Sequence, residues 1–217
     1  MSSREDILGR IRRQIGRTPA NAAAGRLRIG EILARREQGP RPAPCGDLLD
    51  RFRACVEALS STTETVADVE TVPLAVARYL DARQLARSIV VWPQLAALDW
   101  AQAGVVAQAR AANGADLTGV SGAFCAVAET GTLLLCSAAG SPATVSLLPE
   151  THIAVVPASR IVAGMEEAFG LVRAEIGELP RALNFVSGPS RTGDIEQTIV
   201  LGAHGPYRVH VILLRDS

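Results

Sequence analysis

The stretch THIAVVPASRIVAGMEEAFGLVRAEI, residues 151–176, decides the fold class. Its first eight residues form a nearly continuous apolar run rich in β-branched side chains, which predicts a buried strand. From Arg160 to Ile176 the apolar side chains recur with the period of a helix, which predicts an amphipathic helix. A fully buried strand followed by such a helix is typical of a parallel sheet covered by helices.

The same alternation of strands and helices extends in both directions from this stretch. Helices are expected over residues 46–60 and 68–82, with Pro73 in the first turn of the second one. Further elements are strands at residues 62–68, 88–92, 131–137, 181–188 and 207–214 and a short helix at residues 192–200. The sequence therefore predicts an α/β fold with a mostly parallel sheet covered by helices. Ligands of such sheets bind in the loops that follow the carboxyl ends of strands.

The composition narrows the classes of function. Apolar residues make up 48% of the 217 residues, which is enough for a proper core, while aromatic residues are only 4%. So few rings argue against a stacking platform for single-stranded nucleic acid. All 22 basic residues are arginine, which excludes a Schiff-base lysine and the phosphate-binding lysine of a Walker motif.

Charge is distributed unevenly along the chain. Residues 1–41 hold ten arginines and four acids, a net charge of +6, whereas residues 42–217 hold twelve arginines and eighteen acids, a net charge of −6. The basic segment could dock onto an acidic partner or onto its own body. No recognised nucleic-acid motif accompanies it, so nucleic acid is not expected as a partner.

The basic segment is also separable by its predicted structure. Amphipathic helices are expected at residues 3–16 and 26–37, and a linker rich in proline and glycine follows them. The chain is therefore divided into a basic helical arm with its linker, residues 1–40, and an α/β domain, residues 41–217.

The cysteines and the N-terminus bear on cofactors and location. The four cysteines, at positions 45, 55, 125 and 136, are scattered without a C-x-x-C pair, so they predict neither a zinc nor an iron–sulfur ligand set. They are typical of small buried side chains in a reducing cytosol. The N-terminus does not resemble a secretory signal, and residues 140–142 break the uncharged run after Glu129, so no membrane span is expected.

Glu129 stands alone among apolar residues. It is the only ionisable acid or base, cysteines aside, from residue 117 to residue 149, and it opens the turn ETGT, residues 129–132. A carboxylate in an apolar site needs hydrogen bonds or a proton. Two interpretations stay open: a structural carboxylate that bonds backbone N–H groups of its own loop, and a general base, nucleophile or ligand anchor.

Residues 186–196, VSGPSRTGDIE, hold a second group of polar side chains. One interpretation is structural: Ser190, Thr192 or Asp194 caps a helix that begins here. The other is an anion site, in which Arg191 and free backbone N–H groups hold a phosphate or a carboxylate. A metal is not expected, because no histidine–acid spacing supports one.

The histidines differ in their predicted roles. His204 lies in a turn before the last strand and is a candidate acid–base group. His210 lies on one face of that strand and is expected to be structural. His152 opens a predicted strand, and the sequence indicates no partner for it.

Four segments in this order, AETGTLLL, LPETHIAVV, GPSRTGDIEQTIVLGAHGP and VHVILL, resemble the lactate-utilization (LUD) domain family. The resemblance covers about residues 45–214, and the arm is similar to the N-terminal part found in that family. It implies a fold like that of phosphosugar isomerases and coenzyme A transferases. It also implies a cytoplasmic role in the oxidation of L-lactate to pyruvate beside two iron–sulfur partner proteins, with no cluster in this chain.

The resemblance also places the family's motif residues on this sequence. The candidate catalytic residues are Glu129 and His204. The candidate ligand-binding residues are Thr130, Gly131, Thr132, Gly188, Ser190, Arg191, Asp194, Glu196 and Gly205. We expect the three motif segments to converge in one site.

Two functional hypotheses are compatible with these residues. The first is an accessory or substrate-binding subunit of an L-lactate-oxidising system, which binds a small anionic metabolite, holds no cofactor of its own and works with iron–sulfur subunits. The second is a stand-alone enzyme that uses Glu129 in acyl or coenzyme A transfer, phosphosugar or folate-type chemistry, by analogy with proteins of similar fold.

Overall fold

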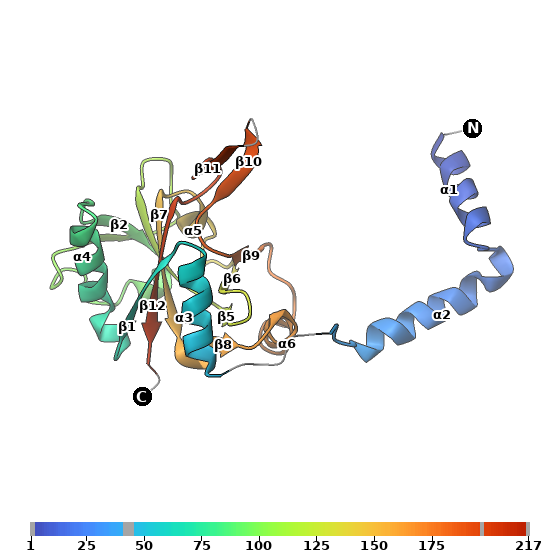
Figure 1. Ribbon diagram of the computed structural model, residues 1–217, viewed down its shortest axis with the longest axis horizontal. Coiled ribbons are helices and arrows are strands. Elements are labelled where there is room, and N and C mark those ends of the chain that lie inside the picture. Colours follow the sequence, from blue (N-terminus) through green and yellow to red (C-terminus); the bar gives the residue numbers. More distant parts are fainter. Residues whose placement is uncertain (1–2, 41–45, 196–197, 216–217) are drawn as a thin grey trace. The chain divides into compact units, whose positions relative to one another are not determined.

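The computed structural model describes residues 3–40, 46–195 and 198–215. The chain divides into two compact units, Met1–Ala43 and Pro44–Ser217 (Figure 1). The first unit holds two helices, and the second holds all the described strands.

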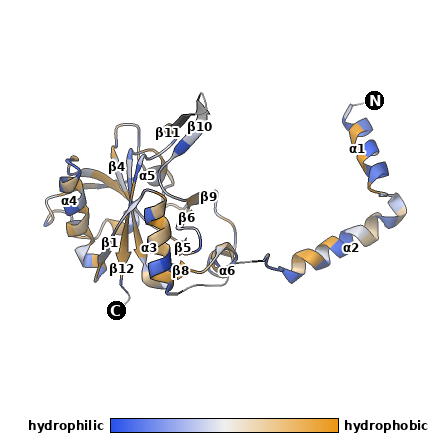
Figure 2. Cartoon of the chain, in the orientation of Figure 1, coloured by the Kyte–Doolittle hydropathy of each residue, from blue (hydrophilic) through white to orange (hydrophobic). Residues whose placement is uncertain are grey.

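The first unit consists of α1 (Ser3–Gln14) and α2 (Pro19–Arg35). α2 begins at Pro19 rather than at residue 26 because Thr18 caps it. The Thr18 Oγ1 atom accepts a hydrogen bond from the Asn21 N–H at 3.4 Å, and Asn21 Oδ1 accepts one from the Thr18 N–H at 2.9 Å. Apolar and charged residues are interleaved along both helices (Figure 2), and no residue of either helix is buried.

The second unit is built on a six-stranded sheet in which every neighbouring pair of strands is parallel. The order is β1-β12-β7-β4-β2-β3. The strands are β1 (Thr62–Val66), β2 (Ser88–Val91), β3 (Val106–Ala109), β4 (Thr118–Gly122), β7 (Thr151–Pro157) and β12 (Arg208–Leu214). The predicted α/β fold with a mostly parallel sheet is confirmed.

α4 (Val72–Ala82) packs on one face of this sheet and α3 (Leu48–Ala58) on the other. The other helices and 3-10 turns in the described part of this unit are η1 (Val69–Thr71), η2 (Pro93–Leu95), α5 (Thr144–Leu147), η3 (Ala158–Arg160) and α6 (Met165–Glu175). Pro73 lies in the first turn of α4 as predicted, where its missing N–H leaves no hydrogen bond unmade. On the face of the sheet that α4 covers, Val76 and Leu80 are fully buried against Ile153 and Ile212.

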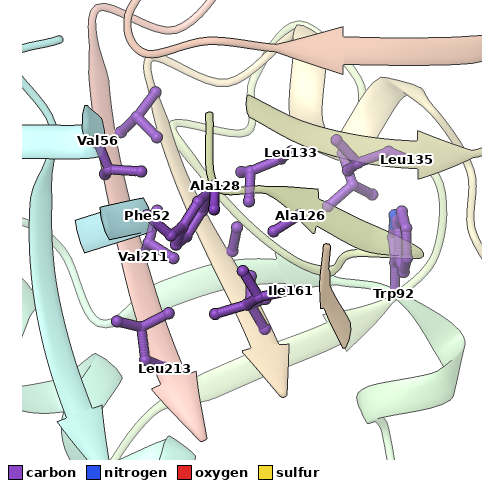
Figure 3. Packing of buried hydrophobic residues seen from close by; sticks show 14 of the residues in the cluster. Phe52, Val56, Trp92, Ala126, Ala128, Leu133, Leu135, Ile161, Val211 and Leu213 are labelled. Carbon is purple, nitrogen blue, oxygen red and sulfur yellow. The ribbon is translucent and has the colours of Figure 1, made fainter. Parts of the chain in front are cut away.

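The opposite face carries the second half of the core. There Phe52 and Val56 of α3 pack with Val211 of β12 and with Leu133 and Leu135 (Figure 3). The two leucines belong to a second sheet, so this layer consists of α3 and that sheet side by side.

The second sheet has the order β8-β5-β6-β9. Its strands are β5 (Cys125–Val127), β6 (Thr132–Cys136), β8 (Ile161–Val162) and β9 (Leu183–Val186). The strands predicted at residues 131–137 and 181–188 are therefore present, but they are antiparallel neighbours in this sheet rather than members of the parallel one. Ala168 and Val172 of α6 pack against its other face. α6 begins at Met165, later than predicted, because the residues of β8 pair with β5.

The short helix predicted at residues 192–200 is wrong. The segment is an antiparallel hairpin of β10 (Arg191–Ile195) and β11 (Thr198–Leu201), in which Thr192 pairs with Val200. The threonine, isoleucine and valine side chains favour a strand, and the segment has no apolar stripe of helical period to bury. β3, β4 and β5 were not predicted, because they are short and rich in Gly, Ala, Ser and Cys.

None of the helices in the described ranges is long and apolar enough to cross a membrane.

Candidate functional site

The predicted motif segments lie mainly at the amino-terminal edge of the parallel sheet. Arg191 contacts Leu59 and Ser60, which precede β1, and Ser190 contacts Pro206, which precedes β12. β1 and β12 are parallel neighbours, so their amino ends lie at one edge. The segments around Arg191 and His204 therefore do not lie at the carboxyl edge of the parallel sheet, where ligands of such sheets usually bind.

The ETGT turn rests on the backbone of α3. Gly131 has a left-handed φ of +62°, and a Cβ added to it would come within 2.8 Å of the Cys55 carbonyl carbon and the Val56 nitrogen. Only glycine satisfies both conditions. The Cys55 thiol also donates a weak hydrogen bond to the Glu129 carbonyl oxygen at 3.6 Å.

Glu129 is half-buried, and its backbone holds its place. Its N–H donates to the Ala163 carbonyl oxygen at 3.1 Å, and its own carbonyl accepts from Cys55. Within the described ranges its carboxylate has no hydrogen-bond or ion-pair partner. The structural interpretation requires this carboxylate to accept hydrogen bonds from backbone N–H groups of its own loop. No such bond occurs among those residues, so the side chain is available to a ligand.

A chain of three hydroxyl groups joins the ETGT turn to the end of β9. The Thr130 and Thr132 hydroxyls are 2.7 Å apart, and the Thr132 and Ser187 hydroxyls are also 2.7 Å apart. Thr132 is only 2% exposed, while Thr130 and Ser187 are exposed. Each hydroxyl has one donor and can also accept, so the chain can present a donor at one open end and an acceptor at the other. Sequence reasoning missed Ser187, whose only signal is its position between a strand and Gly188.

Gly188 and Arg191 attach the next motif segment to the end of α3. Gly188 has a φ of +77°, and a Cβ on it would lie 2.8 Å from the Leu59 carbonyl oxygen. Nη2 of Arg191 donates to that same oxygen at 3.0 Å and to the Ser60 Oγ at 2.8 Å. A guanidinium at this point also complements the negative end of the helix dipole. Its Nε and Nη1 atoms have no hydrogen-bond partner among the described residues.

The third segment joins the second through Ser190. The Ser190 N–H donates to the Pro206 carbonyl at 2.8 Å, and the Ser190 carbonyl accepts from the Gly202 N–H at 2.9 Å. A Cβ on Gly205 would lie 3.4 Å from the Ser190 Cβ. His204 is exposed on this loop. The helix-capping interpretation of this region is wrong, because the segment after Ser190 is a strand.

Together these residues form what we call the motif cluster: the ETGT turn 129–132, residues 187–191 and residues 204–206, joined to one another and to the end of α3. α3 was not predicted as part of the site, since its residues carry no motif. Of Asp194, only the backbone in β10 is described, and Glu196 lies outside the described residues.

Two further histidines are buried outside the motif cluster. His152 is fully buried with Nε2 2.7 Å from the Ser121 hydroxyl. His210 has Nδ1 2.8 Å from the Thr62 hydroxyl, and its ring stacks on Tyr79 at 4.2 Å. Loss of hydration lowers the pKa of each histidine from 6.5 to about 4, so both are neutral near pH 7.

The thiols and possible metal ligands complete the chemistry of the second unit. Burial raises the pKa of both Cys125 and Cys136 to about 11, which leaves little reactive thiolate at neutral pH. Among the residues that the structure describes, no group of three or more histidine, cysteine and acidic side chains is placed to hold a metal ion.

The fold just described, a parallel six-stranded sheet with a second sheet and α3 on one face, is similar to that of a solved structure. This is the crystal structure of a DUF162 family protein from Deinococcus radiodurans at 1.70 Å resolution. The two chains share 27% sequence identity with a TM-score of 0.58, over 79% of this chain and 99% of that one. The sequence pattern of the LUD domain matches residues 4–214. The chain therefore belongs to the LUD domain family, and the resemblance noted in its motifs is confirmed.

Proteins called lactate utilization protein C are similar to this chain, which supports this membership. Lactate utilization protein C of Exiguobacterium sp. (strain ATCC BAA-1283 / AT1b) is 32% identical over 232 residues, covering 100% of this chain and 97% of that protein. Lactate utilization protein C of Bacillus subtilis (strain 168) is 42% identical over 93 residues, covering 42% of this chain and 39% of that protein. The protein of the same name from Shouchella clausii (strain KSM-K16) is 44% identical over 93 residues, covering 42% of this chain and 41% of that protein.

Proposed function

We propose that this chain acts in L-lactate utilization as an accessory or substrate-binding subunit, and that the motif cluster binds a small carboxylate. The observation that carries the proposal is a chain of contacts: two motif segments attach to the end of α3, and the third joins the second of them through Ser190. The name of a relative that matches along the whole chain supports the pathway.

The free polar groups of the motif cluster suit a 2-hydroxy or 2-oxo acid. The Nε and Nη1 donors of Arg191 would bind the ligand carboxylate, because charge-assisted hydrogen bonds to carboxylates are strong. The hydroxyl chain through Thr132 would bond the neighbouring oxygen. Glu129, whose carboxylate has no partner among the described residues, would accept the hydroxyl hydrogen of a 2-hydroxy acid and so favour it over the 2-oxo acid.

In this proposal the redox centre belongs to partner proteins. Oxidation of a hydroxy acid to an oxo acid releases two electrons and two protons, and iron–sulfur partners would take the electrons. Two thiols of this chain are poor ligands for an iron–sulfur cluster, which agrees with that proposal. Cys125 and Cys136 have pKa values raised to about 11, and metal ligands must be thiolates. The cytoplasm is the proposed location.

Growth and co-purification test the role in the pathway. Deletion of the gene in the native host is expected to abolish or slow growth on L-lactate but not on glucose, and a tagged copy is expected to recover iron–sulfur proteins. Normal growth on L-lactate together with purification of the chain alone would refute the proposal.

Thermal unfolding with added ligand tests the site. At a concentration one hundred times its Kd, a ligand stabilises the folded state by about 2.7 kcal/mol, which raises Tm by roughly 5–10 °C in a domain of this size. L-Lactate and pyruvate are expected to raise Tm of the unmodified chain. Glu129→Gln should reduce the L-lactate shift more than the pyruvate shift, whereas Arg173→Gln, an exposed change on α6, should reduce neither. Equal shifts in all three proteins would contradict the assignment.

One observation also favours the stand-alone enzyme as a second candidate: the half-buried Glu129 carboxylate without a partner among the described residues resembles a nucleophile or base held ready. Such an enzyme would turn over a thioester, a sugar phosphate or a folate. Turnover that persists unchanged in Glu129→Gln, or no turnover of any of the three, would eliminate it.

A further inference from the structure

The two helices of the first unit meet at a corner that polar contacts fix in place. The turn after α1 contains a left-handed Gly16 with a φ of +63°, and the Arg17 N–H donates to the Arg12 carbonyl oxygen at 2.8 Å. Beyond the capping box at Thr18, the Asn21 side-chain amide donates to the Gly16 carbonyl at 2.8 Å. The corner is therefore built by its own hydrogen bonds, without a buried apolar core.

This corner encloses an open groove of about 480 Å³, which we call the arm groove. Its apolar lining comes from both helices and the turn: Leu8, Ile11, Ile15, Pro19 and Ala22. Ile11 is 46% exposed and Ile15 is 64% exposed, so the first unit does not itself cover these side chains. Water-exposed isoleucines on a preformed corner are typical of a surface that a partner covers.

The charges on the groove define which partner fits. The remaining lining residues include Arg12, Arg17 and Arg26 but no acid. Within the described ranges, none of these three guanidinium groups takes part in an ion pair. The net charge of +6 over residues 1–41 also favours an acidic occupant, and it disfavours a second copy of the arm, which would carry the same charge.

We propose that the arm groove binds an acidic amphipathic helix of a partner protein. The apolar lining would accept leucine or isoleucine side chains at positions i, i+3, i+4 and i+7, the pattern of helices that bind in grooves. Carboxylates beside that stripe would bind the three arginines, whose planar donors match carboxylate geometry. A nucleic acid would satisfy the arginines but leave Ile11 and Ile15 uncovered. The proposal concerns the arm alone and does not depend on the ligand of the motif cluster.

A synthetic helix tests this proposal on the full-length chain. The probe is a fluorescein-labelled 21-residue peptide with leucines at the spacing given above and glutamates at the flanking positions. A matched peptide carries glutamine in place of every glutamate. Fluorescence anisotropy is expected to show saturable binding of the glutamate peptide, about tenfold or more weaker binding of the glutamine peptide, and weakening of the first by 0.5 M salt.

Variants then assign the binding to the groove. Ile15→Ser and the double change Arg12→Gln with Arg26→Gln are each expected to weaken binding by about tenfold or more. Arg28→Gln is the matched control, because Arg28 is an exposed arginine of α2 that does not line the groove. Circular dichroism of each variant establishes that the helices persist, so that lost binding is not lost structure.

Four results would each overturn the proposal. The first is no saturable binding of the glutamate peptide, and the second is equal binding of the two peptides. The third is an equal effect of Arg28→Gln and the double change. The fourth is that a 20-base-pair DNA duplex, or vesicles of phosphatidylcholine and phosphatidylglycerol, displaces the labelled peptide at a lower concentration than unlabelled peptide does. The last would identify a nucleic acid or a membrane surface as the better occupant.

Discussion

Acid should destabilise this protein well above the pH at which most carboxylates titrate, because two histidines are buried in neutral form. His152 is fully buried, and His210 is only 4% exposed. Desolvation lowers the pKa of each to about 4, against 6.5 for an ordinary histidine. Between these values the unfolded chain binds protons that the folded chain does not, so the free energy of unfolding falls as pH falls through 6.5 and toward 4.

The magnitude follows from the two pKa values. At pH 5 each side chain is almost fully protonated in the unfolded chain but only about a tenth protonated in the folded one. The difference removes about 2 kcal/mol per histidine relative to pH 8, or about 4 kcal/mol for the pair. That is a large fraction of the 5–15 kcal/mol by which a typical domain is stable. The ion-paired carboxylates of Asp81 and Glu175, whose ordinary pKa values are 3.8 and 4.5, contribute mainly at lower pH.

Urea unfolding at pH 8.0, 6.5, 5.5 and 5.0 measures this loss. His152→Gln and His210→Gln each keep a polar side chain but remove one titration, so each should lose about 2 kcal/mol less than the unmodified chain between pH 8 and pH 5. Comparing each variant with itself across pH cancels the stability change caused by the substitution. His204→Gln is the control: its ring is exposed, and the loss of stability should match that of the unmodified chain.

The reasoning fails in two cases. A free energy of unfolding that is flat from pH 8 to pH 5.5 would mean that the two rings are hydrated or already charged in the folded protein. A loss that is unchanged in both glutamine variants would assign the pH dependence to other groups.

Three more results are expected. Gly131→Ala should destabilise the fold by about 2–4 kcal/mol in urea unfolding, because a Cβ meets the α3 backbone and the left-handed φ adds strain. Gly170→Ala is the control: it lies in α6 with open space around it and should stabilise the fold by about 0.5–1 kcal/mol. A Gly131→Ala variant as stable as the unmodified chain would contradict the close approach. Cys125 and Cys136 should react with a thiol reagent at pH 8 only after denaturation, because burial raises both pKa values to about 11, and rapid labelling of the folded chain at these positions, read by peptide mass spectrometry, would refute this. Glu129→Gln should change the free energy of unfolding by no more than about 0.5 kcal/mol, since its carboxylate has no partner among the described residues, and a loss of several kcal/mol would show that it holds the turn after all.

Sequence patterns predicted the elements whose stability is local. The apolar runs of β7 and β12 and the periodic stripe of α6 mark single strands and a helix without reference to the rest of the chain. Strand direction is not encoded in this way, so the strands later found as β6 and β9 were assigned to the wrong sheet. The hairpin of β10 and β11 was predicted as a helix because Ser190, Thr192 and Asp194 are residue types that cap helices, and such residues also occur by chance in other structures.

The candidate site was predictable in its residues and not in its architecture. The motif string around Glu129 and Arg191 is visible in the sequence, and the structure links these segments through the hydroxyls of Thr132 and Ser187. The surface on which they meet is the end of α3, whose contribution is made largely by backbone atoms. No side-chain pattern records a backbone contact, so sequence reasoning could not find it.

The two sides of the contact between the motif segments and α3 should tolerate amino-acid substitution to different degrees. Gly131 and Gly188 each approach backbone atoms of α3, at Cys55, Val56 and Leu59. Every residue type supplies the same backbone atoms, so this contact does not restrict the side chains at Cys55 and Leu59, while Val56 is restricted by the core into which it packs. A saturation library across both segments should therefore retain glycine alone at 131 and 188 but accept several residues at 55 and 59.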